Sequence, residues 1–371
     1  MSKLFSPLTL NLSEKQQTTV RNRLIMPPMC MYSADSEGPR VGLPNPFHLE
    51  HYGVRATSVG QVVVEATGIR PDGRISPQCL CVSEDTRPED FAPLATAIKE
   101  KGALAGIQLN HAGPKASELV ASPRISPDSL STSEISELVA TWGHAAKLMA
   151  EAGFDFVQVH SAHGYLLHSF LSPYTNHRTD EYGGMLENRA RFVLQVLAEV
   201  GRYLPVAVRF SGTDWLGEDG LEIAEVEYVA QWAQALGVHQ ISMSTGGIAP
   251  DASAIPVGPG YQVFAARQVR AAMDSMILPV HDLITDEVLE QRWNQTSEDD
   301  ESAWRDYCAK VSAVGIILNG VQAESILATG AADLIEVGRP LLANPYLGFK
   351  WQAELGEEVE LPRQYRRAVI V

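Results

Sequence analysis

Short apolar segments alternate with longer stretches of helical periodicity along almost the whole chain, and this alternation limits the possible folds more than any other feature. The predicted strands are Leu24–Pro27, Gln61–Glu65, Leu104–Leu109, Phe154–His160, Val206–Phe210, Gln240–Ser244 and Asp333–Val337. The predicted helices are Pro88–Lys101, Ser133–Ala152, Leu186–Arg202, Ile223–Leu236 and Gln262–Met273. Strict alternation predicts parallel βαβ units, and strands that are apolar on both faces suit a covered parallel sheet. We therefore expect a (β/α)₈ TIM barrel.

A closed barrel needs an eighth strand before Asp333, and two segments could provide it: Ile277–Val280 and Val311–Ile317. Residues 281–310 include a strongly acidic run at 297–301. This composition predicts a surface insertion near strand 7, with one helix over Asp286–Trp293 followed by a loop. Because α/β barrels often reach this length as one unit, we expect a single domain over residues 1–371.

An open, doubly wound sheet is the main alternative fold. Its nucleotide-binding form carries a G-x-G-x-x-G turn after the first strand. Here that position reads Met-Pro-Pro-Met-Cys, residues 26–30, which disfavours such a unit.

Composition excludes several classes of partner. The net charge of −16 and the absence of a Lys/Arg cluster argue against nucleic acid and anionic membranes. No run of 18 apolar residues occurs, and the first 20 residues have no apolar signal core. Four cysteines without a C-x-x-C pair do not suggest a disulfide framework. We expect a soluble cytoplasmic protein.

Polar residues stand where the predicted strands end, which is where a barrel builds its active site. Gln108 ends the third strand, Arg209 lies near the end of the fifth, and Gly338-Arg339 follows the last. A Gly-Arg pair that opens a helix suits a phosphate, and Gln108 with Arg209 suits an anionic, carbonyl-rich heterocycle.

The fourth strand ends in His160 and His163, followed by Tyr165. Spacing alone leaves three interpretations equally open. The two histidines could bind a metal with Asp180 or Glu187, could donate hydrogen bonds to one carbonyl oxygen beside Tyr165 as a proton donor, or could only satisfy backbone groups.

Longer motifs add a family resemblance. The relevant segments are His160–Leu166 (HSAHGYL), Phe170–Pro173 (FLSP), Asn176–Gly184 (NHRTDEYGG) and Glu187–Arg189 (ENR). Together they resemble the signature of the Old Yellow Enzyme family. The opening Asn22–Ser33 (NRLIMPPMCMYS) is similar to its thermophilic-like branch, which includes NADPH dehydrogenases and xenobiotic reductases.

The resemblance implies noncovalently bound FMN, no metal, and NADPH (or NADH) as electron donor. The cofactor-binding residues that it implies are Pro27, Pro28, Met29, Cys30, Ala66, Gln108, Arg209, Gly315, Gly338 and Arg339. Three residues depart from the family pattern: Pro27 replaces Ser or Ala, Pro114 replaces Arg, and Leu318 replaces Thr. None of the three departures removes a group assigned to the chemistry.

The same resemblance implies an ene-reductase acting on small activated alkenes by a ping-pong cycle. His160 and His163 would hold the substrate carbonyl, Tyr165 would donate the proton, and Tyr32 and Cys30 would contact the substrate. Arg367 would reach the active site of a neighbouring subunit, with Arg366 as the second candidate for this role, which predicts a homodimer. The alternative is a flavin-binding barrel with a dedicated metabolic substrate, or with turnover impaired by the insertion.

Overall fold

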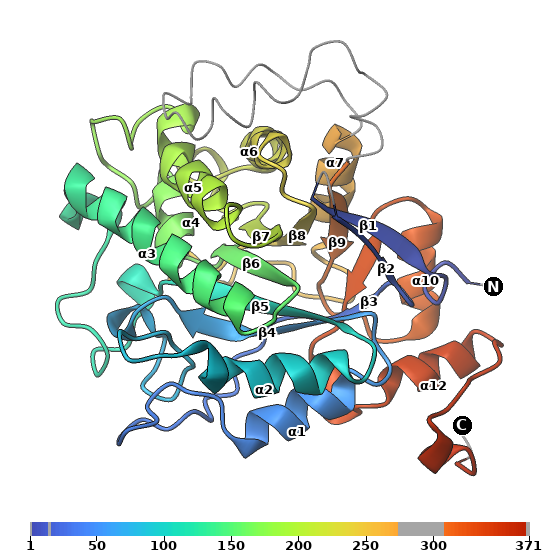
Figure 1. Ribbon diagram of the computed structural model, residues 1–371. Helices are drawn as coiled ribbons and strands as arrows, with labels where there is room; N and C mark the ends of the chain where they lie inside the picture. The colour runs from blue at the N-terminus through green and yellow to red at the C-terminus, as the bar shows by residue number, and fades with distance from the viewer. Residues whose placement is uncertain (1, 14–15, 274–307, 369–371) are drawn as a thin grey trace.

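Eight parallel strands close into one barrel in the computed structural model, which describes residues 2–13, 16–273 and 308–368. The strands follow the order β10-β3-β4-β5-β6-β7-β8-β9, and β10 pairs with β3 to close the sheet (Figure 1). Their bounds are β3 Leu24–Met26, β4 Gln61–Gly68, β5 Leu104–Asn110, β6 Phe156–Ser161, β7 Val206–Ser211, β8 Gln240–Ser244, β9 Lys310–Ala313 and β10 Leu334–Glu336. The TIM barrel is confirmed, and the open-sheet alternative is wrong.

Helices surround this barrel. They are α1 Pro46–Arg55, α2 Pro88–Lys99, α3 Thr132–Glu151, α4 Leu166–Leu171, α5 Leu186–Val200, α6 Ile223–Ala235, α7 Val263–Met273, α10 Gly320–Ala328, α11 Arg339–Ala343 and α12 Leu347–Glu354. The long helix α3 begins at a capping box, in which Ser131 Oγ accepts from the Glu134 amide and Glu134 accepts from the Ser131 amide. The five helices predicted from periodicity are present, with ends that differ by a few residues.

The strand that precedes β10 is β9, which confirms the Val311–Ile317 candidate in part. It begins at Lys310 and pairs with β8 and β10. Lys310 therefore belongs to the barrel, and the expected insertion over 281–310 ended too late. The other candidate strand, Ile277–Val280, and the helix expected at Asp286–Trp293 lie outside the described residues.

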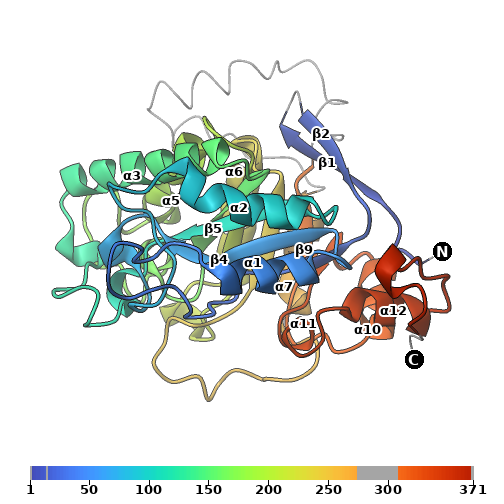
Figure 2. The same ribbon diagram turned by 60° about the horizontal axis from the view of Figure 1, so that its bottom comes forward.

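A hairpin that the sequence analysis did not predict covers the N-terminal end of the barrel. Strands β1 (Leu8–Ser13) and β2 (Gln16–Val20) pair in antiparallel fashion beside the barrel (Figure 2). Leu10, Leu12 and Val20 pack in a cluster with interior barrel residues that include Ile25 and Phe156. This apolar cluster closes one end of the barrel, so a ligand must enter at the other.

The barrel strands are buried on both faces, as their apolar sequences predict. All eight residues of β4 are buried. Gly106 in β5 leaves room for a neighbour, because a Cβ there would lie 2.3 Å from the ring of Phe156. Within the described residues, no helix combines the length and apolar character needed to cross a membrane.

Candidate active site at the C-terminal ends of the strands

Three aromatic rings meet just beyond the end of β6. The ring centroids of His160 and His163 are 5.2 Å apart, and those of His160 and Tyr165 are 4.9 Å apart. Both contacts are edge-to-face. The chain turns sharply to bring the rings together, because His163 adopts a left-handed φ of 61° and Gly164 follows at 76°. The residues predicted from the sequence at this strand end therefore form one cluster.

A buried network holds this turn in place. The His163 amide donates to Ser211 Oγ at 3.0 Å, and the Gly164 amide donates to His168 Nδ1 at 2.8 Å. The other nitrogen of His168 lies 3.0 Å from Asp214. His168 and Asp214 were not predicted from the sequence, although a buried carboxylate paired with a histidine is a common way to fix a loop.

The surroundings determine the protonation of the three side chains. Burial first, and then the charge of Arg209, lower the pKa values of His160 and His163 well below their usual range. Burial raises the pKa of Tyr165 above its usual value. At neutral pH the cluster therefore contains two neutral imidazoles and one protonated phenol. Neutral imidazoles can donate one hydrogen bond each, and the phenol keeps a proton to give.

The imidazoles of His160 and His163 differ in which ring nitrogen has a hydrogen-bond partner. His160 Nδ1 is buried and has no hydrogen-bond partner among the described residues. His163 Nε2 is 2.7 Å from Ser244 Oγ, whose oxygen accepts from Gln262 at 3.2 Å. When the Ser244 hydroxyl donates its proton to Nε2, the ring proton of the neutral imidazole lies on Nδ1. A ligand contact from His163 therefore falls to Nδ1.

The loop after β3 supplies a second wall of the site. The Met31 amide donates to buried Glu65 at 2.8 Å, which ties this loop to β4. The free thiol of Cys30 is hydrogen-bonded to the thiol of Cys79 and to the backbone of Ala66. The hydrogen bond to Cys79, together with burial, raises the pKa of Cys30. The predicted residues Cys30 and Ala66 are thus neighbours, and Cys79 is a partner that the sequence analysis missed.

Tyr32 and Lys115 flank the ring of Tyr165. Tyr32 is half exposed at a left-handed φ of 52°. Burial is the main cause of the raised pKa of Tyr165, and electrostatic interactions with Cys30 and Tyr32 add to it. Lys115 Nζ lies 5.4 Å from the centre of the Tyr165 ring and donates to the carbonyls of His163 and Gly247. Lys115 directly follows Pro114, so a cation remains beside the site although the family arginine is absent.

Arg209 lies in the barrel interior beside the histidines, and it has a partner that the sequence analysis did not anticipate. Its Nη1 donates to Glu336 in β10 at 3.0 Å. Its Nε is buried and has no partner among the described residues. On the neighbouring strand β6, Gln158 accepts from Gln108 of β5 at 2.7 Å, and the amide nitrogen of Gln158 is itself unpartnered in the described chain. Unpaired buried donors of this kind call for a ligand with acceptor atoms.

The loops after β9 and β10 lie at the same end of the barrel. Gly315 has a φ of 119°, and a Cβ there would clash with Gln262, so only glycine fits. A Cβ at Gly338 would lie 3.1 Å from Met29 Sδ and 3.9 Å from Pro27, which places the β10 loop against the β3 loop. Arg339 is exposed at the start of α11. The structure therefore gathers the predicted cofactor residues at one rim.

The metal interpretation of His160 and His163 finds no support in the described residues. No group of three or more His, Cys, Asp or Glu side chains there is placed to bind a metal ion. Asp180 instead pairs with Arg178.

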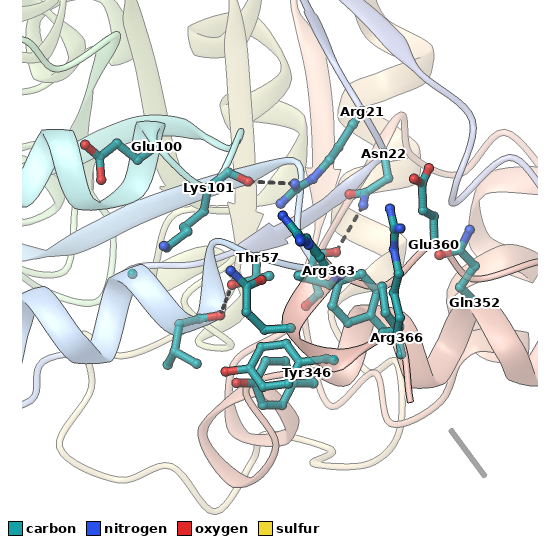
Figure 3. A pocket seen from close by; sticks show the side chains of 18 of the residues that line it. Arg21, Asn22, Thr57, Glu100, Lys101, Tyr346, Gln352, Glu360, Arg363 and Arg366 are labelled. Atoms are coloured by element: carbon teal, nitrogen blue, oxygen red, sulfur yellow. Dashed lines mark hydrogen bonds between the residues drawn. The ribbon is translucent and has the colours of Figure 1, made fainter. Parts of the chain in front are cut away.

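Arg367 lies away from this site within its own subunit. It is exposed, two residues after a short turn at Arg363–Tyr365. That turn borders a cleft of about 1170 Å³ that is also lined by Arg21, Asn22 and Lys101, which precede strands β3 and β5 (Figure 3). The tail thus packs at the N-terminal end of the barrel, opposite the ring cluster.

Comparison with known proteins agrees with this arrangement. Residues 3–297 match the model of the NADH:flavin oxidoreductase / NADH oxidase family. NADPH dehydrogenase from Bacillus subtilis is 37% identical and aligns over 98% of both chains. NADPH dehydrogenase from Halalkalibacterium halodurans is also 37% identical, over 94% of this chain and 95% of the relative.

The chain belongs to the NADH:flavin oxidoreductase / NADH oxidase family.

Solved structures of Old Yellow Enzyme type share its fold. The old yellow enzyme homologue from Zymomonas mobilis has a TM-score of 0.74 at 24% identity, covering 98% of this chain and 96% of its own. Morphinone reductase has a TM-score of 0.69 at 25% identity, covering 97% and 91%. Membership of the flavin oxidoreductase family makes the protein an NAD(P)H-dependent flavin oxidoreductase with FMN as its cofactor.

The residues present fit FMN. The unpartnered donors of Arg209 and Gln158 suit the carbonyl and ring-nitrogen acceptors of a flavin. Gly315 and Gly338 leave room for close approach to the backbone, and Arg339 is an exposed cation, features that suit the phosphate of FMN.

Proposed function

We propose that the protein is an ene-reductase, which reduces carbonyl-activated C=C bonds with electrons from NADPH or NADH. One observation carries this proposal: two neutral histidines and one protonated tyrosine form a single ring cluster at the open end of the barrel. Two donors and one acid are what polarisation and protonation of an enone require.

The cofactor would be held by the residues gathered at the rim. Cys30 and Ala66 would line the ring, Gln108 and Arg209 would contact its polar edge, and Gly315, Gly338 and Arg339 would hold the phosphate. The proposed set is completed by Pro27, Pro28 and Met29. Bound FMN supplies the hydride.

The protein's own side chains would carry out the remaining chemistry. His160 and His163 would donate hydrogen bonds to the substrate carbonyl oxygen, which makes the β-carbon electrophilic. Tyr165 would transfer its phenolic proton to the α-carbon, and solvent would then reprotonate the phenolate. Tyr32 would cover the substrate from the β3 loop. The product gains one hydride and one proton across the former double bond.

We further propose a homodimer of single-domain subunits, because Arg367 is exposed and follows a turn that borders the cleft at the N-terminal end of the barrel, opposite the ring cluster. In such a dimer Arg367 would enter the neighbouring site. Free thiols at Cys30 and Cys79 fit a reducing compartment, and we propose the cytoplasm.

The test is to measure the two half-reactions of Tyr165→Phe separately by flavin absorbance under anaerobic conditions. We expect NADPH to reduce the flavin at nearly the wild-type rate, because that step needs no proton from Tyr165. Reoxidation by cyclohexenone should slow by about 10²–10⁴-fold, the usual contribution of a general acid. Tyr228→Phe, an exposed tyrosine on α6, is the matched control. Equal reoxidation rates in Tyr165→Phe and wild type would refute the proton-donor role.

A further inference from the structure

Glu336 is a buried carboxylate for which the proposed reaction has no use. It lies at the end of β10 with 1% of its surface exposed. One oxygen accepts from Arg209 at 3.0 Å, and the other accepts from Ser312 Oγ in β9 at 2.7 Å. Moving a carboxylate into a barrel interior is costly unless its charge is paired. Its position is therefore closely tied to Arg209.

The pairing limits what Arg209 can offer a ligand. Glu336 engages one terminal nitrogen of the guanidinium, while the buried Nε is left without a partner among the described residues. Because Ser312 anchors the second carboxylate oxygen, the guanidinium has a fixed orientation. The carboxylate also offsets the positive charge of Arg209 at close range in a medium of low dielectric constant.

We propose that Glu336 is a positioning residue that aims Arg209 at the flavin and lowers the reduction potential of the cofactor by offsetting the charge of Arg209. This inference rests on the proposed contact between Arg209 and the flavin. A cation beside the polar edge of a flavin stabilises the reduced, more negative state and raises the potential. A carboxylate paired with that cation weakens this stabilisation, so the enzyme holds its flavin at a lower potential than Arg209 alone would set.

The experiment is to measure the flavin reduction potential of the FMN-loaded Glu336→Gln variant by anaerobic titration against a redox dye. Glutamine keeps the shape and one acceptor oxygen but removes the negative charge. We expect the equilibrium to shift about tenfold toward reduced flavin, which is a rise of about 30 mV for a two-electron couple. Ser312→Ala removes a hydrogen bond to Glu336 and leaves its charge, so its potential should stay close to that of wild type.

A second variant guards against misfolding, because Glu336→Gln leaves Arg209 without its counter-charge. Glu336→Asp keeps the charge and draws it back by one methylene, and we expect a smaller rise in potential. A potential unchanged in both Glu336 variants would overturn the inference.

A third variant, Arg209→Lys, distinguishes two outcomes: that Glu336 has no influence on the potential, and that Arg209 does not contact the flavin. If Arg209→Lys changes the potential or the FMN dissociation constant while both Glu336 variants match wild type, only the role of Glu336 is wrong. If Arg209→Lys changes neither quantity, the proposed contact between Arg209 and the flavin falls together with the role of Glu336. The ene-reductase proposal rests on the ring cluster and is tested separately by Tyr165→Phe.

Discussion

The half-buried Arg21 and the buried Arg209 lie at opposite ends of the same barrel, and their surroundings differ. Arg21 donates to the backbone carbonyls of Ala56, Val59 and Lys101, so its guanidinium is fully used within the protein (Figure 3). Arg209 donates to Glu336 and keeps a buried Nε without a partner in the described chain. One arginine completes the structure, whereas the other is left ready for a ligand.

Backbone strain shows the same asymmetry. In the described residues, the non-glycine positions with left-handed φ are Tyr32, His163, Trp215 and Ile316. All four lie in loops that follow the C-terminal ends of β3, β6, β7 and β9. Such residues cost on the order of 1–3 kcal/mol each and persist where the surroundings enforce them, often at functional sites. The N-terminal end instead holds a regular hairpin and an apolar cluster.

Replacing Arg21 should affect stability and leave chemistry intact. Arg21→Met leaves the carbonyls of Val59 and Lys101 without their donor, and we expect the free energy of unfolding to fall by about 2–3 kcal/mol. Turnover per bound FMN should match wild type. Chemical denaturation and steady-state kinetics would measure the two quantities.

Arg363→Met is the matched control, because Arg363 borders the same cleft and is exposed. Its unfolding free energy should stay within about 0.5 kcal/mol of wild type. A loss of turnover in folded, FMN-loaded Arg21→Met would contradict the view that the N-terminal end of the barrel contributes to stability and not to the chemistry.

Replacing Arg367, at the N-terminal end of its own barrel, should have a smaller effect, and this effect should appear in substrate binding. If it enters the partner's site, Arg367→Ala should raise the KM for cyclohexenone several-fold, about 1 kcal/mol as for an exposed charge contact, and leave flavin reduction by NADPH unchanged. Light scattering should show a dimer at micromolar concentration. Monomers alone, or an unaltered KM, would remove the intersubunit contact from the proposal.

Most of the barrel could be predicted because its strands are apolar on both faces and end in polar residues. The hairpin β1–β2 was missed although β1 alternates apolar and polar residues, because β2 (QQTTV) contains a single apolar residue and shows no strand pattern. Residues 46–55 were missed as a helix although Asn45 and Pro46 are typical N-terminal residues, because His48, Glu50 and His51 obscure the apolar periodicity.

The site could be predicted in its residues but not in its internal pairing. The His-x-x-His-x-Tyr spacing identified three residues that the fold brings together. Glu336 was missed because a single acidic residue within Leu-Ile-Glu-Val gives no hint of its partner 127 positions away. The sequence assigned Arg209 to an anionic heterocycle, whereas the structure shows an anionic partner for Arg209 within the protein, Glu336.

The most direct measurement is the visible absorption spectrum of the purified protein under anaerobic conditions, before and after NADPH and then after cyclohexenone. The account predicts a flavin band that NADPH bleaches and cyclohexenone restores, since both substrates would use the open end of the barrel in turn. A protein that stays colourless when FMN is added, or a bleached band that cyclohexenone fails to restore, would contradict it.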